Sequence, residues 1–269
     1  MSFNREKLSL YLKMKLMPLA WRFTAPAQPE KWIFIVGCYN SGTTLLHKLL
    51  AQHPLVGSLP NEGQFFNNVL PYGRQFGLPR LWALKPDLFH LKETAEGYDV
   101  DRLKRQWTWF YNHSQRPVLI EKTILNMART RWLQQHFPNS YFIAIYRSGY
   151  AVAEGIKRKE GHSLEKGIMQ WSISNDILMD DLHYIKNKIS LKYEDLTAQP
   201  FDELKKITDF LGIDALPANI FDKEFSIHHI DGKISNRNES SLKKLDHDEL
   251  QLMNKVGGAM FEKLGYPML

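Results

Sequence analysis

The stretch from Lys31 to Leu50, KWIFIVGCYNSGTTLLHKLL, decides the fold. It opens with a short apolar run, Trp32–Val36, whose β-branched and aromatic residues are typical of a strand buried on both faces. A polar turn follows, and apolar residues then recur at helical spacing until His53-Pro54, where the helix is expected to stop. The stretch therefore predicts a strand, a loop and a helix in direct succession.

The same alternation continues along the chain. Strands are expected at Val118–Glu121, Tyr141–Tyr146 and Ile189–Tyr193. Helices are expected over about 124–135, 150–159, 164–186 and 201–211, the last ending at Gly212. This order predicts an α/β fold of the P-loop type, a three-layer sandwich in which helices flank a central, mainly parallel sheet. Ligands of such sheets bind beyond the carboxyl ends of the strands.

Composition indicates one domain over residues 1–269, because 43% hydrophobic residues suffice for a substantial core. Cys38 is the single cysteine, so no intrachain disulfide can form, and a reducing, cytoplasmic location is expected. No apolar stretch is long enough to span a bilayer, and no secretory leader pattern is visible. The net charge of +6 is compatible with an anionic ligand, nucleic acid or a membrane surface, and is too modest to choose between them.

Residues 1–30 are expected to form a helical extension. Within it, Leu8, Leu12, Leu16 and Leu19 follow helical spacing, and Lys7, Lys13 and Lys15 fall on other faces. Such a helix either docks on the core of its own protein, which is the interpretation we favour, or lies on anionic lipid.

The loop Gly37–Thr44, GCYNSGTT, has the glycine spacing of a nucleotide-binding P-loop, but Thr43 stands where nucleoside triphosphatases carry lysine. Backbone N–H groups and the start of the next helix still favour an anion. The lysine that reaches the outer phosphates of a nucleoside triphosphate is absent, so a different phosphorylated donor is indicated. A P-loop kinase or nucleotide hydrolase with an altered lysine is the alternative. An ordinary strand-to-helix turn is the other interpretation.

Ser41–Leu46, SGTTLL, followed by His53-Pro54, resembles the 5′-phosphosulfate-binding segment of sulfotransferases. Tyr141–Arg147 resembles their strand ending in an arginine, and Lys192–Leu196 with Pro200 resembles their later strand and turn. The likeness covers roughly residues 31–212 and is strongest to the tyrosylprotein and carbohydrate branch. It implies transfer of a sulfuryl group from 3′-phosphoadenosine 5′-phosphosulfate (PAPS) to a hydroxyl or amine of a glycan, glycolipid or small natural product.

The resemblance also implies individual roles. Glu62, in PNEGQFF, matches the general base, and Lys122 matches the lysine on the transferring group. Arg147 matches the ligand of the donor's 3′-phosphate, and Tyr193 the residue on its adenine. Each residue also has an alternative interpretation. Glu62 could be an exposed loop carboxylate, and Lys122 a surface lysine paired with Glu121. Arg147 could form a structural ion pair, and Tyr193 could be a core tyrosine.

The full donor-binding set implied in this way is Asn40, Ser41, Gly42, Thr43, Thr44, Arg147, Tyr193, Ser235 and Arg237. Lys233, Ser235 and Arg237 lie in the segment GKISNR, which either closes over the nucleotide or is a solvated loop. Two positions depart from the family pattern. Asn40 replaces the usual lysine or arginine and supplies no charge, and Gly155 replaces a serine for which Ser148 or a backbone N–H is a possible substitute.

Residues 55–115 are expected to be the variable, acceptor-facing part. Its aromatic side chains either stack on a sugar or flat acceptor or pack in the core: Phe65, Phe66, Trp82, Trp107, Trp109 and Tyr111. No metal site is predicted, because the pair His228 and His229 lacks further ligands at metal spacing. No nucleic-acid partner is expected either, and a non-enzymatic module that binds nucleic acid or membrane is a minor hypothesis.

Overall fold

The computed structural model describes residues 2–217, 220 and 233–269, with the backbone alone for residues 2–7. The strands are β1 (Lys31–Val36), β2 (Val56–Ser58), β3 (Val118–Glu121), β4 (Ser140–Tyr146) and β5 (Lys188–Lys192). The α-helices are α1 (Ser2–Ala20), α2 (Thr43–Leu50), α3 (Val100–Phe110), α4 (Thr130–His136), α5 (Gly149–Glu160), α6 (Leu164–Leu182), α7 (Tyr193–Ala198), α8 (Pro200–Leu211), α9 (Asn238–Leu242) and α10 (His247–Lys263). Short 3-10 helices are η1 (Trp21–Phe23), η2 (Gly63–Phe65), η3 (Gly73–Phe76), η4 (Trp82–Leu84), η5 (Pro86–Leu88) and η6 (Ile124–Ala128).

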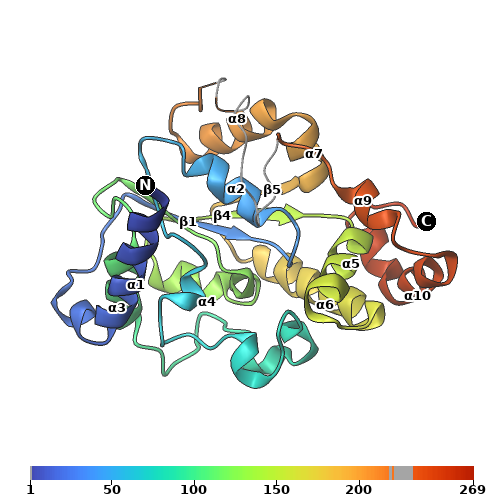
Figure 1. The fold of residues 1–269 in the computed structure, drawn as a ribbon, viewed down its shortest axis with the longest axis horizontal. Helices are drawn as coiled ribbons and strands as arrows, with labels where there is room; N and C mark the ends of the chain where they lie inside the picture. Colours follow the sequence, from blue (N-terminus) through green and yellow to red (C-terminus); the bar gives the residue numbers. More distant parts are fainter. Residues whose placement is uncertain (1, 218–219, 221–232) are drawn as a thin grey trace.

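The five strands form one parallel sheet in the order β2-β3-β1-β4-β5. In register, Ile33 of β1 pairs with Ile120 of β3 on one side and with Tyr141 of β4 on the other. Helices α2, α7 and α8 cover one face of the sheet, and α4, α5 and α6 cover the other (Figure 1). The α/β sandwich with a mainly parallel sheet, predicted from the alternating pattern, is thus confirmed.

Side chains of β1 alternate between two separate cores. Trp32, Phe34 and Val36 belong to the core beneath the sheet, which includes residues of α5 and α6. Ile33 and Ile35 belong to the core on the other face, with residues of α2 and α8. Each fully buried large apolar side chain contributes about 1.5–3 kcal/mol. Burial on both faces explains why this strand is a continuous apolar run rather than an alternating one.

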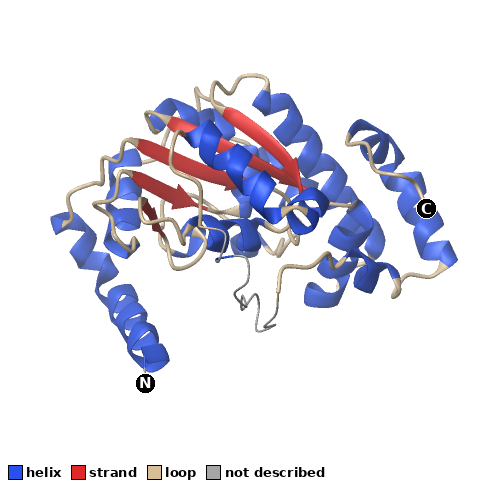
Figure 2. Cartoon of the chain, turned by 90° about the horizontal axis from the view of Figure 1, so that it is seen from above, coloured by secondary structure: helices blue, strands red, loops and turns tan. Residues whose placement is uncertain are grey.

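Helices α1 and α3 lie at one end of the sheet, and α9 and α10 lie at the opposite end (Figures 1 and 2). The favoured interpretation, a helix that docks on the core, is correct, but the leucine stripe is not the docking face: Leu8, Leu12, Leu16 and Leu19 are 50–65% exposed. The helix instead contacts the body through its other side, where Leu10 and Met17 pack against the core and Trp109 Nε1 donates to the Lys13 carbonyl over 3.1 Å. No helix among the described residues has the length and apolarity needed to cross a bilayer.

Several predicted boundaries differ from the structure. The helix expected over 124–135 is split into η6 and α4, because Arg129 leaves helical geometry and its buried guanidinium donates to the Pro71 carbonyl. The helix expected over 164–186 ends at Leu182, and Tyr193 starts α7 instead of ending a strand. Helices α3 and α10 were not predicted, although an aspartate caps the start of each.

Candidate active site

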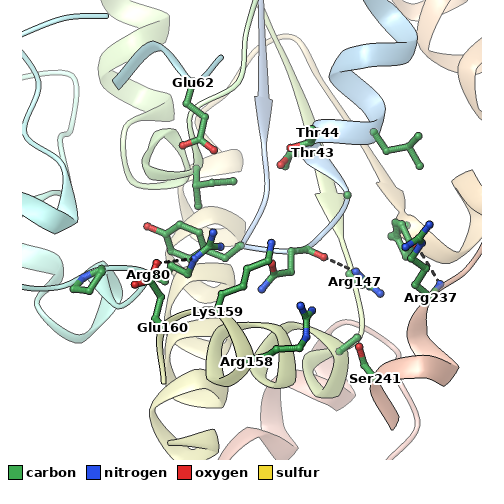
Figure 3. Close-up of a pocket in the computed structure, with 18 of the residues that line it drawn as sticks. Thr43, Thr44, Glu62, Arg80, Arg147, Arg158, Lys159, Glu160, Arg237 and Ser241 are labelled. Atoms are coloured by element: carbon green, nitrogen blue, oxygen red, sulfur yellow. Dashed lines mark hydrogen bonds and ion pairs between the residues drawn. The ribbon is translucent and has the colours of Figure 1, made fainter. Parts of the chain in front are cut away.

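A cavity of about 480 Å³ opens at the carboxyl ends of β1, β4 and β5. The loop after β1, the residues around Glu62, the end of α5 and the start of α9 form its walls (Figure 3). This is the position that the parallel sheet predicts for a ligand, since the loops that follow adjacent strands meet there.

The loop between β1 and α2 is shaped by close packing. A β-carbon at Gly37 would lie 2.5 Å from the Ile145 carbonyl oxygen. Gly42 has a φ of 98°, and a β-carbon there would lie 2.6 Å from the Tyr193 ring. Asn40 also has a positive φ, 60°, which asparagine tolerates better than most residues. The loop thereby leads into α2, whose first N–H groups have no partner within the helix and attract an anion.

Arg147 reaches the same loop from the end of β4. Its Nη1 donates to the Asn40 carbonyl over 2.6 Å, and its Nε donates to Asn238 Oδ1 over 2.7 Å. The guanidinium lies 4.1 Å from the centre of the Tyr193 ring, a cation–π contact. Burial lowers the pKa of Arg147. Within the described part of the chain it forms no ion pair with a carboxylate, so the structural ion pair considered from the sequence is not observed, and the charge is available to an anion.

Glu62 and Lys122 meet across the opposite wall. Lys122 Nζ lies 3.1 Å from Glu62 Oε1 and donates to Thr44 Oγ1 over 3.2 Å. Gln64 Nε2 donates to the other oxygen of Glu62 over 2.5 Å. The Glu62 side chain is 18% exposed and the Lys122 side chain 5%. Glu62 is thus a fixed carboxylate facing the cavity, and Lys122 is a buried lysine that pairs with it rather than with Glu121.

Glu121 holds the backbone next to Glu62 in place. Its carboxylate accepts hydrogen bonds from the N–H of Gly63 over 2.7 Å and from Thr123 Oγ1 over 2.5 Å. Trp107 Nε1 donates to the Gly63 carbonyl over 3.0 Å. Burial raises the pKa of Glu121. These contacts fix both polar groups of Gly63, and so they determine where the neighbouring Glu62 carboxylate points.

Tyr193 connects this centre to the C-terminal segment. Its hydroxyl donates to the Ser235 carbonyl over 3.0 Å and accepts from the Arg237 N–H over 3.3 Å. The ring is almost fully buried, yet it lines the cavity beside Gly42. The segment that contains Ser235 and Arg237 is therefore attached to the cavity wall.

The sequence model of the sulfotransferase family matches residues 32–217. This chain belongs to the sulfotransferase family. It is 26% identical over 197 residues to the protein-tyrosine sulfotransferase A of Caenorhabditis elegans, a match that covers 68% of this chain and 50% of that protein. The chain thus spans about half the length of that curated relative.

The fold is similar to those of solved structures, among them two sulfotransferase domains. One is the sulfotransferase domain from the curacin biosynthetic pathway, with a TM-score of 0.55, 21% identity and coverage of 90% of this chain and 100% of that one. The other is the sulfotransferase domain of the Synechococcus PCC 7002 olefin synthase, with a TM-score of 0.59, 21% identity and coverage of 90% and 97%. The match of the family model confirms the family predicted from the sequence segments, and the two structures agree with the fold.

Most of the residues predicted for this sulfotransferase site line the cavity: Asn40, Gly42, Thr43, Thr44, Glu62, Arg147, Tyr193, Lys233, Ser235 and Arg237. Lys122 is not among the lining residues, but its ammonium group contacts Glu62 and Thr44, which are. The Ser41 side chain is not brought to the cavity, because its buried hydroxyl lies beneath the loop, where a β-carbon at Gly37 would come within 2.7 Å of it. Their roles toward a donor stay predictions. His228 and His229 lie outside the described residues, among which no group of three metal-ligating side chains gathers.

The predicted aromatic face is mostly core. Phe66, Trp82, Trp107 and Tyr111 are at most 4% exposed, and Trp109 anchors α1. Phe65 alone of that group lines the cavity, where it is 44% exposed. Core packing is therefore the correct interpretation for the four buried rings.

Sequence reasoning missed a basic wall opposite Glu62. Charged side chains from α5, the turn after α9 and the loop before η4 line the cavity: Arg80, Arg158, Lys159, Glu160 and Lys244. The signal in the sequence was the run Lys157–Lys159 at the end of the helix that follows Arg147. Such a run at a helix C-terminus is normally explained by the helix dipole alone.

Proposed function

We propose that this protein transfers a sulfuryl group from PAPS to a hydroxyl or amine of an acceptor. The observation that carries the proposal is the 2.6 Å hydrogen bond from Arg147 to the Asn40 carbonyl. It joins an anion-binding loop and a buried arginine in one cavity, as a ligand with phosphate groups at two ends requires. In the proposal the loop Asn40–Thr44 binds the 5′ end of the donor, Arg147 binds the 3′-phosphate, and Tyr193 contacts the adenine.

Glu62 and Lys122 carry out the chemistry in this proposal. Glu62 accepts the proton of the acceptor as its oxygen or nitrogen attacks the sulfur in line. The bond from sulfur to the bridging oxygen breaks, and 3′-phosphoadenosine 5′-phosphate (PAP) leaves with the electron pair. Lys122 stabilises negative charge on the transferring group. Its hydrogen bond to Thr44, together with its pair to Glu62, supports a position between donor and base.

For the acceptor we propose a glycan, a glycolipid or a small natural product. Support comes from the cavity wall beyond Glu62, where Phe65 is half-exposed and meets Tyr72 edge to face at 6.3 Å between ring centres. Exposed aromatic rings beside polar groups suit a sugar face or a flat ring.

The test is incubation with ³⁵S-labelled PAPS and a panel of such acceptors. Wild type is expected to label at least one of them, while Glu62→Ala is expected to bind PAP normally without transfer. Arg147→Ala is expected to bind PAP weakly, and equal donor binding by this variant would contradict its role. Magnesium-dependent turnover of ATP without any sulfuryl transfer would favour the kinase or hydrolase alternative instead.

A cytoplasmic location and a membrane contact through residues 8–19 also belong to the proposal. The exposed leucines of α1, together with the exposed Lys15 and the partly exposed Lys13, suit the surface of an anionic bilayer. In this proposal the contact through α1 holds the enzyme at the cytoplasmic surface of a membrane, where it meets membrane-associated acceptors.

A further inference from the structure

Asn40 and Gly155, the two departures from the family pattern, lie against each other. A β-carbon at Gly155 would lie 2.6 Å from Asn40 Nδ2 and 2.8 Å from its Cγ. Asn40 Nδ2 also donates to the Val152 carbonyl over 3.4 Å. The missing side chain at Gly155 therefore makes room for the amide of Asn40, which is engaged with α5 and brings no charge to the phosphate loop.

Lys159 stands on the same face of α5, because it follows Gly155 by four residues. Figure 3 shows its side chain rising from α5 into the cavity, toward the phosphate loop and on the Glu62 side of Arg147. The Lys159 side chain is exposed there and forms no hydrogen bond or ion pair with any residue that the structure describes.

The other cations of this wall are already paired. Arg158 and Lys244 both contact Glu154, at 3.0 and 3.4 Å. Arg80 contacts Glu160 at 3.3 Å. The carboxylates of Glu154 and Glu160 are thus occupied by other residues.

The surroundings of Lys159 are strongly positive. Partial desolvation, followed by repulsion from Arg80, Arg158, Arg147 and Lys122, lowers the pKa of Lys159 to about 8. Three of these cations are paired with glutamates, but Arg147 has no carboxylate partner among the described residues, so Lys159 and Arg147 together leave positive charge in the cavity that an anion would offset. The lysine, its direction and its charged neighbours together indicate a binding position for an anionic group beside the phosphate loop.

We propose that the Lys159 ammonium group binds the 5′-phosphosulfate end of the donor and supplies the charge that Asn40 does not. This inference rests on the proposed function. A cation at that end also stabilises the charge that develops on the leaving phosphate as the sulfur–oxygen bond breaks, so it acts on the transfer step as well as on binding.

The test measures PAP binding by isothermal titration calorimetry at pH 7. Lys159→Ala is expected to weaken binding about 10- to 100-fold, the usual effect of losing a hydrogen bond to a charged group, and Lys159→Arg to retain most of the affinity. The matched control is Lys157→Ala, which removes the same charge from the same helix at an exposed lysine paired with Glu249. The control is expected to bind like wild type.

Repeating the titration with adenosine 5′-monophosphate identifies the end of the donor involved. The loss in Lys159→Ala persists if the lysine contacts the 5′ end, and a loss that disappears without the 3′-phosphate would overturn the inference. Unchanged PAP affinity in Lys159→Ala would overturn it too, and an accompanying rise in the KM for an acceptor would assign Lys159 to the acceptor. Failure of wild type to bind PAP is a different outcome, since it would reject the proposed function itself.

Discussion

Replacing Gly155 by alanine tests whether positions 40 and 155 are coupled. Alanine in the interior of α5 should stabilise the helix by about 1 kcal/mol relative to glycine. The three atoms nearest to the new β-carbon all belong to Asn40, at 2.6, 2.8 and 3.3 Å. The Asn40 backbone is held by the hydrogen bond from Arg147 to its carbonyl, so relief requires the side-chain amide to rotate and give up its hydrogen bond to the Val152 carbonyl. Overpacking of this kind costs about 1–3 kcal/mol, so Gly155→Ala is expected to lower the free energy of unfolding by up to about 2 kcal/mol.

A double-mutant cycle with Asn40→Gly isolates this effect. Glycine at position 40 removes the colliding atoms and adopts the positive φ without strain. In that background Gly155→Ala should be stabilising, which gives a coupling energy of about 1–3 kcal/mol. Urea unfolding of the four proteins, followed by circular dichroism, measures the cycle. A coupling energy below about 0.5 kcal/mol, with alanine stabilising in both backgrounds, would refute the packing argument.

Three further predictions concern the base, pH and α1. Glu62→Gln should lower kcat about 10²- to 10⁴-fold with PAP affinity unchanged. The control Glu160→Gln, which changes a carboxylate on the opposite wall, should leave kcat near the wild-type value. Equal losses of kcat in steady-state assays of the two variants would reject Glu62 as the base. Since the pKa of Lys159 is lowered to about 8, its charge is present below that pH and lost above it. PAP affinity should therefore fall as pH rises through about 8 in wild type and stay flatter in Lys159→Arg, and identical calorimetric pH profiles would argue against the charge. Leu12→Glu with Leu16→Glu should reduce co-sedimentation with anionic vesicles several-fold without lowering the melting temperature, and undiminished sedimentation would exclude this face as the contact.

The layers of the fold were predictable because short stretches of sequence determine the individual strands and helices. The apolar runs at β1, β3 and β4 are too short for helices and are bounded by turn residues, so their strand assignments were correct within one residue. Helix α3 also had a readable pattern, with Asp99 as N-cap and buried Leu103, Trp107 and Phe110 at helical spacing. It was missed because glycine, proline and aromatic residues around it suggested an irregular region.

The side of α1 that packs was not predictable from its leucines. Their spacing shows that they share a face, but the face that docks is chosen by α3 and η1, which the helix contacts. Leu10 and Met17 pack there, and the regular leucine stripe is left outside. Amphipathic spacing thus predicts that a helix forms, but it does not predict which face packs against the rest of the protein.

The candidate site, like the fold, was predictable only in part. Residues on the phosphate loop and at the end of β4 were found because glycine spacing and the strand end mark them. Lys159 was missed because its position depends on a contact between residues 40 and 155, which only the packing of α5 against the loop shows. Glu121 entered the sequence analysis only in the alternative interpretation, as a surface partner of Lys122, whereas its carboxylate is buried and positions the backbone beside Glu62.

A crystal structure with PAP bound tests the placement of the donor most directly. The account predicts the 5′-phosphate on the N–H groups of Gly42–Thr44 within reach of Lys159, and the 3′-phosphate on the guanidinium of Arg147. A nucleotide bound in the reverse orientation, or bound elsewhere while the loop and Arg147 keep only their present contacts, would contradict it.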